Sequence, residues 1–300
     1  FKARVTTADY AELKAQQLSF AGFAASLPGS TVNLTYKGMP QRLRGAYVSH
    51  DFFRMLGVAP ALGRDFLPED DQPGIDKAVI LSDALWKRDF GGDARVIGQT
   101  VRVNGRAGSV IGVMPPKFTF PANEQVWLPI NTEFPPKPRN DRFIPSVNII
   151  ARLKPGVTLE QANAEVKTLA KQFAEAYPED KQFSLGFVRP LLAAFADGQT
   201  KGLLYTMLAF CAGVLVIACG NVMNMQLARA TLRTKELAIR SSLGATRLRL
   251  MRQMLTESLL VSGLGAVIGV LLALWTTDWV NTAIRNVPNP PPAWMVFTVD

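Results

Sequence analysis

The last third of the chain contains two long stretches without a charged residue. The first runs from Gly202 to Ala228 and the second from Ser258 to Thr277. A helix needs about 20 mostly apolar residues to cross the hydrocarbon core of a membrane. The pattern therefore predicts transmembrane helices over about 203–222 and 258–277. A buried core helix is the alternative interpretation, but soluble helices of this length normally show a polar face.

The second stretch carries two glycines four positions apart, Gly265 and Gly269. Small residues at this spacing lie on one helix face and let a neighbouring backbone approach closely. We therefore expect this helix to pack on another helix through that face. It ends near Trp275 and Trp279, and tryptophan is enriched where a helix leaves the hydrocarbon core.

Polarity changes over much shorter distances in the first 200 residues. Short apolar runs bounded by turn residues predict strands at Val32–Tyr36, Arg42–Val48, Ala78–Leu81, Gln99–Val103 and Arg106–Val113. The last two flank Asn104-Gly105, a strong signal for a hairpin. Capping residues predict three helices, one from Thr6 or Thr7 through Gln17, one capped by Ser49 and stopped by Gly57, and one from Ser82 through Phe90.

Residues of about 147–189 have the pattern of a βαβ unit. The expected strands are Val147–Leu153 and Phe183–Val188, and Thr158 with Gln161 forms a capping box at the start of the helix between them. One face of that helix is apolar, with Leu159, Ala162, Val166, Leu169, Phe173 and Tyr177. Residues Pro190–Thr200 are expected to be a short tether. The fold class is thus an α+β domain over 1–200, followed by α-helical transmembrane segments over 201–300.

The charge of the chain is concentrated between the two apolar stretches. The formal net charge is +9, and seven basic residues lie within 229–252, where Glu236 is the only acidic residue. Short loops rich in lysine and arginine remain in the cytoplasm. We therefore expect a cytoplasmic loop over 229–252. Because much of the net charge lies in this one short segment, nucleic-acid binding is not expected.

This orientation places residues 1–200 and the tail 278–300 outside the cytoplasm. The expected location is the cell (inner) membrane, with several spans. Because an exported N-terminal domain needs a preceding span, we also expect a further span before Phe1 and treat the chain as a fragment.

Candidate chemistry is sparse. Cys211 and Cys219 would lie about 12 Å apart along a helix, too far for a disulfide. His50 is the only histidine and is expected to be a cap or surface residue. The acidic run Glu69–Asp71 lacks the alternating ligands of a calcium loop and is expected to be a solvated turn. Since no phosphate-binding loop is present either, we expect no catalytic residue, no metal and no cofactor in this chain.

Several segments together resemble MacB/FtsX-type ABC transporter permeases, and the resemblance covers nearly the whole chain. In the membrane half they are Arg229, Arg233, Glu236, Arg240, the turn Leu243-Gly244-Ala245, Arg249, Gln253 and Glu257-Ser258. In the first half they are Ala78–Leu81 with Trp86, Phe90–Asp93, VIGQTVRVNG (Val96–Gly105), VIGVMPPKFTFP (Val110–Pro121) and ARLKPGVTLEQA (Ala151–Ala162). The resemblance implies a MacB-like periplasmic core domain and an FtsX-like membrane domain. MacB itself carries an ATPase domain on the same chain, which this sequence does not contain.

The resemblance also implies a function and a set of partners. A permease of this kind couples ATP hydrolysis in the cytoplasm to motion of the outer domain, for export or efflux, and is not itself an enzyme. The alternative is a membrane scaffold that regulates an extracytoplasmic enzyme such as a cell-wall hydrolase. The implied partners are a cytoplasmic ABC ATPase subunit, a second permease unit (a dimer or tandem copy), membrane lipid and a periplasmic adaptor.

The basic segment is similar to the coupling helix that lies against the ATPase in this family. The residues expected to contact the ATPase are Lys235, Glu236, Leu237, Ile239, Arg240, Leu243, Gly244 and Ala245. The residues expected to contact lipid headgroups are Arg229, Arg247 and Arg249.

Overall fold

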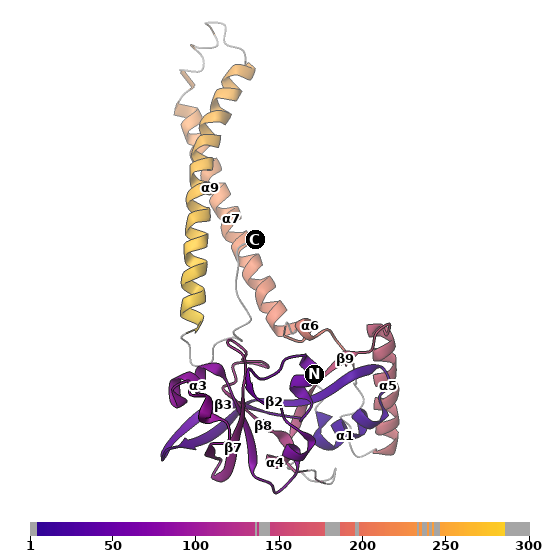
Figure 1. Cartoon of the computed structure of the whole chain (residues 1–300). Coiled ribbons are helices and arrows are strands. Elements are labelled where there is room, and N and C mark those ends of the chain that lie inside the picture. Colours follow the sequence, from indigo (N-terminus) through magenta and orange to yellow (C-terminus); the bar gives the residue numbers. More distant parts are fainter. Residues whose placement is uncertain are drawn as a thin grey trace. The chain divides into compact units, whose positions relative to one another are not determined.

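The computed structural model describes residues 5–135, 137, 145–177, 187–195, 198–232, 234–235, 239, 242 and 247–285 (Figure 1). The chain forms two compact units, whose boundaries include one between Arg189 and Pro190 and one between Ala283 and Ile284. The first unit contains the strands, and the second contains the long apolar helices. Each unit is described by itself.

A closed ring of six strands forms the centre of the first unit. In order around the ring, the strands are β2 (Phe20–Tyr36), β3 (Met39–Val48), β8 (Val126–Pro129), β5 (Lys77–Leu81), β7 (Arg106–Val113) and β6 (Thr100–Val103). The ring closes because β6 pairs with both β7 and β2. The β3–β8 and β5–β7 pairs are parallel, and the other four are antiparallel. This barrel has no free strand edge along the ring.

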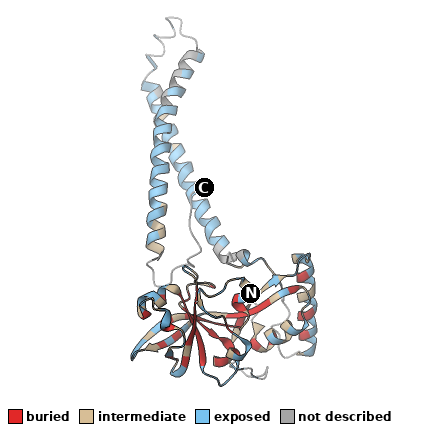
Figure 2. Cartoon of the chain, viewed as in Figure 1, coloured by how far each residue is buried: buried red, intermediate tan, exposed pale blue. Residues whose placement is uncertain are grey.

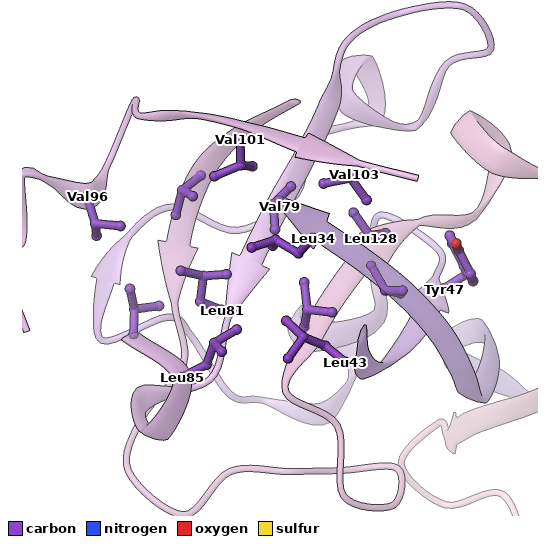
Figure 3. Close-up of a cluster of buried hydrophobic side chains, with 14 of the residues drawn as sticks. Leu34, Leu43, Tyr47, Val79, Leu81, Leu85, Val96, Val101, Val103 and Leu128 are labelled. Atoms are coloured by element: carbon purple, nitrogen blue, oxygen red, sulfur yellow. The ribbon is translucent and has the colours of Figure 1, made fainter. Parts of the chain in front are cut away.

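The barrel is filled by aliphatic side chains from all six strands (Figure 3). Val32 of β2, Val79 of β5 and Val103 of β6 are completely buried there. Alternate residues of a strand point to opposite faces, so each strand contributes every second residue to this interior. The sequence pattern of β2 and β6 therefore dictates which residues point outward.

Two tight turns set the register of the barrel strands. In the predicted hairpin, Asn104 and Gly105 connect β6 and β7, with φ angles of +49° and +80°. Lys37 and Gly38 connect β2 and β3 in the same way, with φ angles of +48° and +79°. Two successive residues with positive φ match the right-handed twist of the flanking strands.

A second core lies on the outside of the barrel and is mainly aromatic. Phe52 and Phe53 of α2 (Phe52–Leu56) pack with Phe66 and with Trp127 of β8, and all four are completely buried. Figure 2 shows the buried positions concentrated in these strands and short helices. The remaining short elements of this lobe are β4 (Leu62–Gly63), η1 (Pro68–Asp71), α3 (Asp83–Phe90), η2 (Ala94–Val96) and α4 (Ile130–Glu133).

The N-terminal half of β2 leaves the barrel and joins a smaller layer. A bulge between Leu27 and Ser30 separates the two halves. Beyond it, β2 pairs with β9 (Ser146–Leu153), which pairs with β1 (Val5–Thr6). Helices α1 (Thr7–Gln16) and α5 (Leu159–Ala176) cover this layer through a core that includes Phe20, Phe23 and Ala162.

Most helix starts follow the capping pattern. Thr6 and Thr158 form capping boxes with Asp9 and Gln161, and Ser82 caps α3. The predicted cap at Ser49 is wrong. Its hydroxyl donates to Asp51 Oδ1 at 2.7 Å and accepts the Ala25 N–H at 3.1 Å, so it ties β2 to the end of β3. Asp51 is the N-cap residue of α2, without a side-chain bond to the helix.

The second strand predicted for the βαβ unit, Phe183–Val188, is described only at its last two residues. Residues 183–186 lie outside the described part of the chain, whereas Phe187 and Val188 are described and are not in a strand. The backbone N–H and C=O of Val188 bond instead to the side chain of Asn163 on α5, at 2.5 and 2.9 Å. These groups are therefore not available to a sheet.

The second unit begins with a short helix, α6 (Leu191–Phe195), within the segment expected to be a tether. Two long helices follow, α7 (Gly198–Leu232) and α9 (Arg247–Arg285).

Candidate functional site

Helix α7 is long and apolar enough to cross a membrane. Its candidate span, Lys201–Arg229, has 29 residues and no residue buried within the chain. At 1.5 Å per residue it extends over about 43 Å, more than the roughly 30 Å of a hydrocarbon core. A core helix of a soluble protein would be buried, so this exposure contradicts the alternative interpretation (Figure 2).

Helix α9 contains the second candidate span, Leu259–Ile284, with 26 residues and again none buried. Trp275 and Trp279 are exposed on it, as expected for side chains at a membrane interface. A side chain added at Gly265 or Gly269 would meet nothing within 4 Å. The described residues of this chain thus leave the face of these two glycines open.

Threonine hydroxyls in both spans form hydrogen bonds inside their own helices. Thr206 donates to the Gly202 carbonyl at 2.9 Å in α7, and Thr277 donates to the Ala273 carbonyl at 2.8 Å in α9. Such bonds to the preceding turn allow a hydroxyl to enter an apolar environment.

The end of α7 is different, because it carries amide side chains. Asn221 and Asn224 are exposed and three positions apart, so they share one helix face. Asn221 lies eight residues before Arg229, or about 12 Å along the helix axis. At that distance from the basic end of the helix, its side chain would lie in the hydrocarbon region. A membrane would make these amides costly unless headgroups or another helix bonded them.

The basic segment begins where α7 ends. Arg229, Lys235 and Ile239 are exposed, and Ile239 is 61% exposed although it is aliphatic. The side chains of Arg247 and Arg249 are not described, but both residues belong to the first turn of α9. The other residues of the predicted ATPase contact lie outside the described part of the chain, namely Glu236, Leu237, Arg240, Leu243, Gly244 and Ala245.

The start of α9 is unusual in its charge. Its first turn contains no acidic residue, whereas Arg247, Arg249 and the exposed Arg252 all lie near its N-terminus. The N-terminus of a helix carries partial positive charge, so these arginines destabilise it locally. An anionic surface against this turn would remove that penalty.

Several charged side chains of the first unit form ion pairs within it. Lys77 is only 1% exposed and forms an ion pair with Glu133 of α4. Burial and the nearby charge of Glu133 raise the pKa of Tyr47 to about 12. Its hydroxyl accepts a hydrogen bond from Asn104 at 2.8 Å. This group was not predicted, since its members are far apart in the sequence.

The acidic run after Pro68 is not the solvated turn that the sequence predicted. Asp71 is buried and accepts the N–H groups of His50 and Asn131, at 3.3 and 2.8 Å. Asp70 accepts two hydrogen bonds from Arg64. Burial alone would raise the pKa of the Asp70 carboxyl, but its bonds to Arg64 and Leu67 lower it. Within the described residues, no group of three or more His, Cys, Asp or Glu could hold a metal ion.

Comparison with known proteins connects both units to one kind of membrane protein. The family model described as MacB-like periplasmic core domain matches residues 1–169, and the model described as FtsX-like permease C-terminal matches residues 208–299. The macrolide export ATP-binding/permease protein MacB of Salmonella paratyphi A is 28% identical over 268 residues, which cover 87% of this chain and 39% of the relative. The protein of the same name from Chromobacterium violaceum is 28% identical over 245 residues, 77% of this chain and 36% of the relative. The chain thus spans about two fifths of the length of these relatives.

Two solved structures are similar to part of this chain. The periplasmic region of MacB from Actinobacillus actinomycetemcomitans has a TM-score of 0.47 at 17% identity, covering 57% of this chain and 75% of that one. The extracellular domain of the noncanonic ABC-type transporter YknZ from Gram-positive bacteria has a TM-score of 0.45 at 17% identity, covering 59% and 87%.

Proposed function

Because this chain belongs to the family of proteins with a MacB-like periplasmic core domain, continued by an FtsX-like permease segment, we propose that it is a permease subunit that couples cytoplasmic ATP hydrolysis to motion of an extracytoplasmic domain. The export or efflux of a substrate follows from that motion. The partner that hydrolyses ATP is a cytoplasmic ABC ATPase subunit, and residues 1–200 lie outside the cytoplasm. The chain is a multi-pass protein of the inner membrane, joined there by a second permease unit.

One observation carries this proposal. Between the candidate spans Lys201–Arg229 and Leu259–Ile284 there are six basic residues and two acidic ones, and a seventh basic residue, Arg229, ends the first span. Such a segment is retained in the cytoplasm, which puts the first unit on the other side of the membrane. In a chain with this arrangement, movement of the basic segment in the cytoplasm can be transmitted through the spans to the domain outside.

The positive charge at the start of α9 favours contact between this segment and a negatively charged surface. Lipid headgroups and acidic residues of an ATPase both provide negative charge, and they are expected to contact different residues. We assign Lys235 through Ala245 to the ATPase, and Arg229, Arg247 and Arg249 to lipid.

Charge reversal at Arg240 tests this division. Ion pairs four residues apart on a helix surface contribute only about 0.3–0.5 kcal/mol, so the loss of any such pair with Glu236 in Arg240→Glu should leave expression and membrane insertion unchanged. A charge in a protein interface is worth about 2–5 kcal/mol, which corresponds to roughly 30-fold to several thousand-fold in affinity. We expect Arg240→Glu to abolish co-purification with a co-expressed ABC ATPase subunit.

The matched control is Arg249→Glu, which makes the same charge change at a residue assigned to lipid. It should preserve co-purification. Equal loss from both variants would mean that the segment is an undifferentiated basic anchor, and retention of the ATPase by Arg240→Glu would remove the coupling assignment.

A further inference from the structure

The barrel closes through a short pairing between β2 and β6, which we call the seam. Two pairs of residues join the strands there, Leu34 with Val103 and Thr35 with Arg102. Leu34 and Val103 point into the barrel at the seam (Figure 3). A pairing of this length makes few backbone hydrogen bonds. Side-chain hydrogen bonds next to the seam are therefore important for keeping the barrel closed.

Asn104 supplies such bonds. It follows β6 directly, at the start of the turn into β7. Its backbone N–H donates to the Asn33 carbonyl at 2.8 Å, and its side-chain Oδ1 accepts the Asn33 N–H at 2.9 Å. Its Nδ2 donates to the Tyr47 hydroxyl at 2.8 Å. One residue thus ties the end of β6 to both β2 and β3.

The residue after Asn104 makes this amide chemically reactive. The backbone N of a following residue can attack an asparagine side chain, and glycine has no side chain to hinder the attack. Asn104-Gly105 is the only Asn-Gly pair in the sequence, and Gly105 is exposed. Among the asparagines of this chain, Asn104 therefore has the neighbour that most favours deamidation.

The reaction consumes water and releases ammonia. The N of Gly105 attacks Cγ of Asn104, so an N–Cγ bond forms and the Cγ–Nδ2 bond breaks. The proton of the Gly105 N–H leaves with Nδ2 as ammonia, and a cyclic succinimide remains. Water then opens the ring to aspartate or, at the other carbonyl, to isoaspartate. In isoaspartate the side-chain carbon has entered the main chain.

We propose that Asn104 is a deamidation site, that its side-chain hydrogen bonds at the seam slow the reaction, and that conversion to isoaspartate opens the seam. Attack requires Cγ to approach the N of Gly105, so the amide must first leave Asn33 and Tyr47. The second partner is held firmly. Tyr47 is only 3% exposed, and its ring packs edge-on against Phe134 with the centroids 5.1 Å apart.

Isoaspartate removes the contacts that Asn104 makes. The additional main-chain carbon displaces the N–H of this residue from the Asn33 carbonyl, and loss of Nδ2 removes the bond to Tyr47. The new carboxylate also adds negative charge beside the Tyr47 hydroxyl, which already lies in the field of Glu133. The end of β6 is then no longer fixed to β2 and β3.

This modification is separate from the proposed coupling to an ATPase. It involves only residues of the first unit, and it does not depend on membrane orientation, on ATP or on a transported substrate. Loss of co-purification in Arg240→Glu would leave it unaffected, so the two proposals can fail independently.

Timed incubation of the full chain in detergent tests the control of the rate. The chain is held at mildly alkaline pH, either native or in denaturant, and the peptide that contains Asn104 is analysed by mass and by chromatographic separation of its products. Each side-chain hydrogen bond contributes about 1 kcal/mol, or about fivefold. With two such bonds, the native chain should convert at least about 25-fold more slowly than the unfolded chain. Tyr47→Phe keeps the ring and removes one bond, so native conversion should become about fivefold faster.

Two matched controls separate the hydrogen bonds from other causes. Val79→Ala weakens the same core without touching Asn104 and should leave the rate at the parental value. Pro155→Asn creates a second Asn-Gly pair in an exposed turn before α5, where Gly156 has a φ of +82°. In the native chain this pair should convert at least about fivefold faster than Asn104, and in denaturant at a similar rate.

Hydrogen exchange measures the effect on the seam. In a partly converted sample, the peptide of β2 that contains Leu34 should show a second population that exchanges faster, because its pairing with β6 is lost. The size of this population should equal the fraction of isoaspartate. Peptides of β9, which pairs with the other half of β2, should show one population only.

Four results would overturn the proposal. They are equal conversion rates in the native and unfolded chain, an unchanged rate in Tyr47→Phe, equal acceleration by Tyr47→Phe and Val79→Ala, and parental exchange of the Leu34 peptide after conversion to isoaspartate.

Discussion

Glu124 is a buried carboxylate that holds an irregular part of the fold. It is completely buried in the loop before β8. Its Oε1 accepts the N–H of Gly29 at 2.9 Å, and Gly29 has a φ of +69° in the bulge where β2 leaves the barrel. Its Oε2 has no hydrogen-bond partner among the described residues. Burial raises the pKa of this carboxyl, although the Gly29 N–H and the charge of Arg44 oppose the shift.

A raised pKa has a definite consequence for stability. The folded chain binds this proton more tightly than the unfolded chain, so the free energy of unfolding falls as pH rises from the unfolded pKa through the folded one. In Glu124→Gln the amide oxygen still accepts the Gly29 N–H, and the ionisation is gone. We therefore expect a smaller loss of stability between about pH 4.5 and 7 than in the parent. The measurement is the thermal midpoint of the chain in detergent, followed through the buried Trp127.

The matched control is Glu160→Gln, which removes an exposed glutamate from the first turn of α5. It should keep the parental pH dependence. Burial also raises the pKa of Asp65, which adds a slope of the same sign. The slope of Glu124→Gln should thus be reduced and not abolished, and a slope equal to that of the parent would refute the role of Glu124.

Lys77 shows what short-range patterns cannot predict about a single residue. It begins β5, and its neighbours Ala78–Leu81 were expected to be buried, but a lysine at that position was not. Its partner Glu133 lies 56 residues later, in α4. A charge is buried only where an opposite charge accompanies it, and the sequence does not reveal such distant pairs.

The Lys77–Glu133 pair predicts a strongly non-additive pair of substitutions. Glu133→Gln leaves the Lys77 ammonium buried without its counter-charge, which costs about 3 kcal/mol, at the lower end of the usual range because Glu133 is 27% exposed. Lys77→Met/Glu133→Gln removes both charges and should recover most of that loss. Thermal unfolding of the two variants checks this, and equal destabilisation by both would show that the charge is not the cause.

At the scale of elements, local signals predicted the helix starts and the hairpin. A capping box or an Asn-Gly turn acts within four residues, so Thr158 and Asn104-Gly105 were correctly interpreted. The first half of β2 was missed because Pro28-Gly29 reads as an interruption, whereas the structure accommodates both residues in a bulge. Closure of the barrel by the β2–β6 pair joins Leu34 to Val103, and no local pattern specifies such a contact.

The glycine pair of α9 gives a prediction at the same scale. Nothing lies within 4 Å of a side chain added at Gly269, so Gly269→Leu should not disturb this chain by itself. If another helix packs on this face, the leucine prevents close approach. We expect Gly269→Leu to lower the fraction of assembled permease, measured by cross-linking in the membrane.

Gly263→Leu is the matched control for this substitution. Gly263 is also open in α9, but at 100° per residue it lies on a different face from Gly265 and Gly269. Both variants gain about the same helix propensity. Cross-linking equal to the parent in both variants would mean that this face contacts lipid only.

At the scale of the whole molecule, the two units differ in what stabilises them. The first unit has three hydrophobic clusters of its own, whereas the spans of the second have no buried residue. An exposed apolar helix of this length is stable only in a membrane or against other apolar helices. The proposed coupling therefore depends on the orientation of α7, that is, on which of its ends lies in the cytoplasm.

That topology is the last prediction. The basic residues between the spans should keep the segment after α7 in the cytoplasm, and the first unit should lie outside. Gln72 and Thr231 are both exposed, so a cysteine at either position is accessible from its own side. In a Cys211→Ala/Cys219→Ala background, Gln72→Cys should react with a membrane-impermeant thiol reagent in intact cells. Thr231→Cys should react only after the membrane is permeabilised. The reverse pattern would invert the orientation and contradict the coupling of this segment to a cytoplasmic ATPase, and reaction at both positions in intact cells would exclude a cytoplasmic loop.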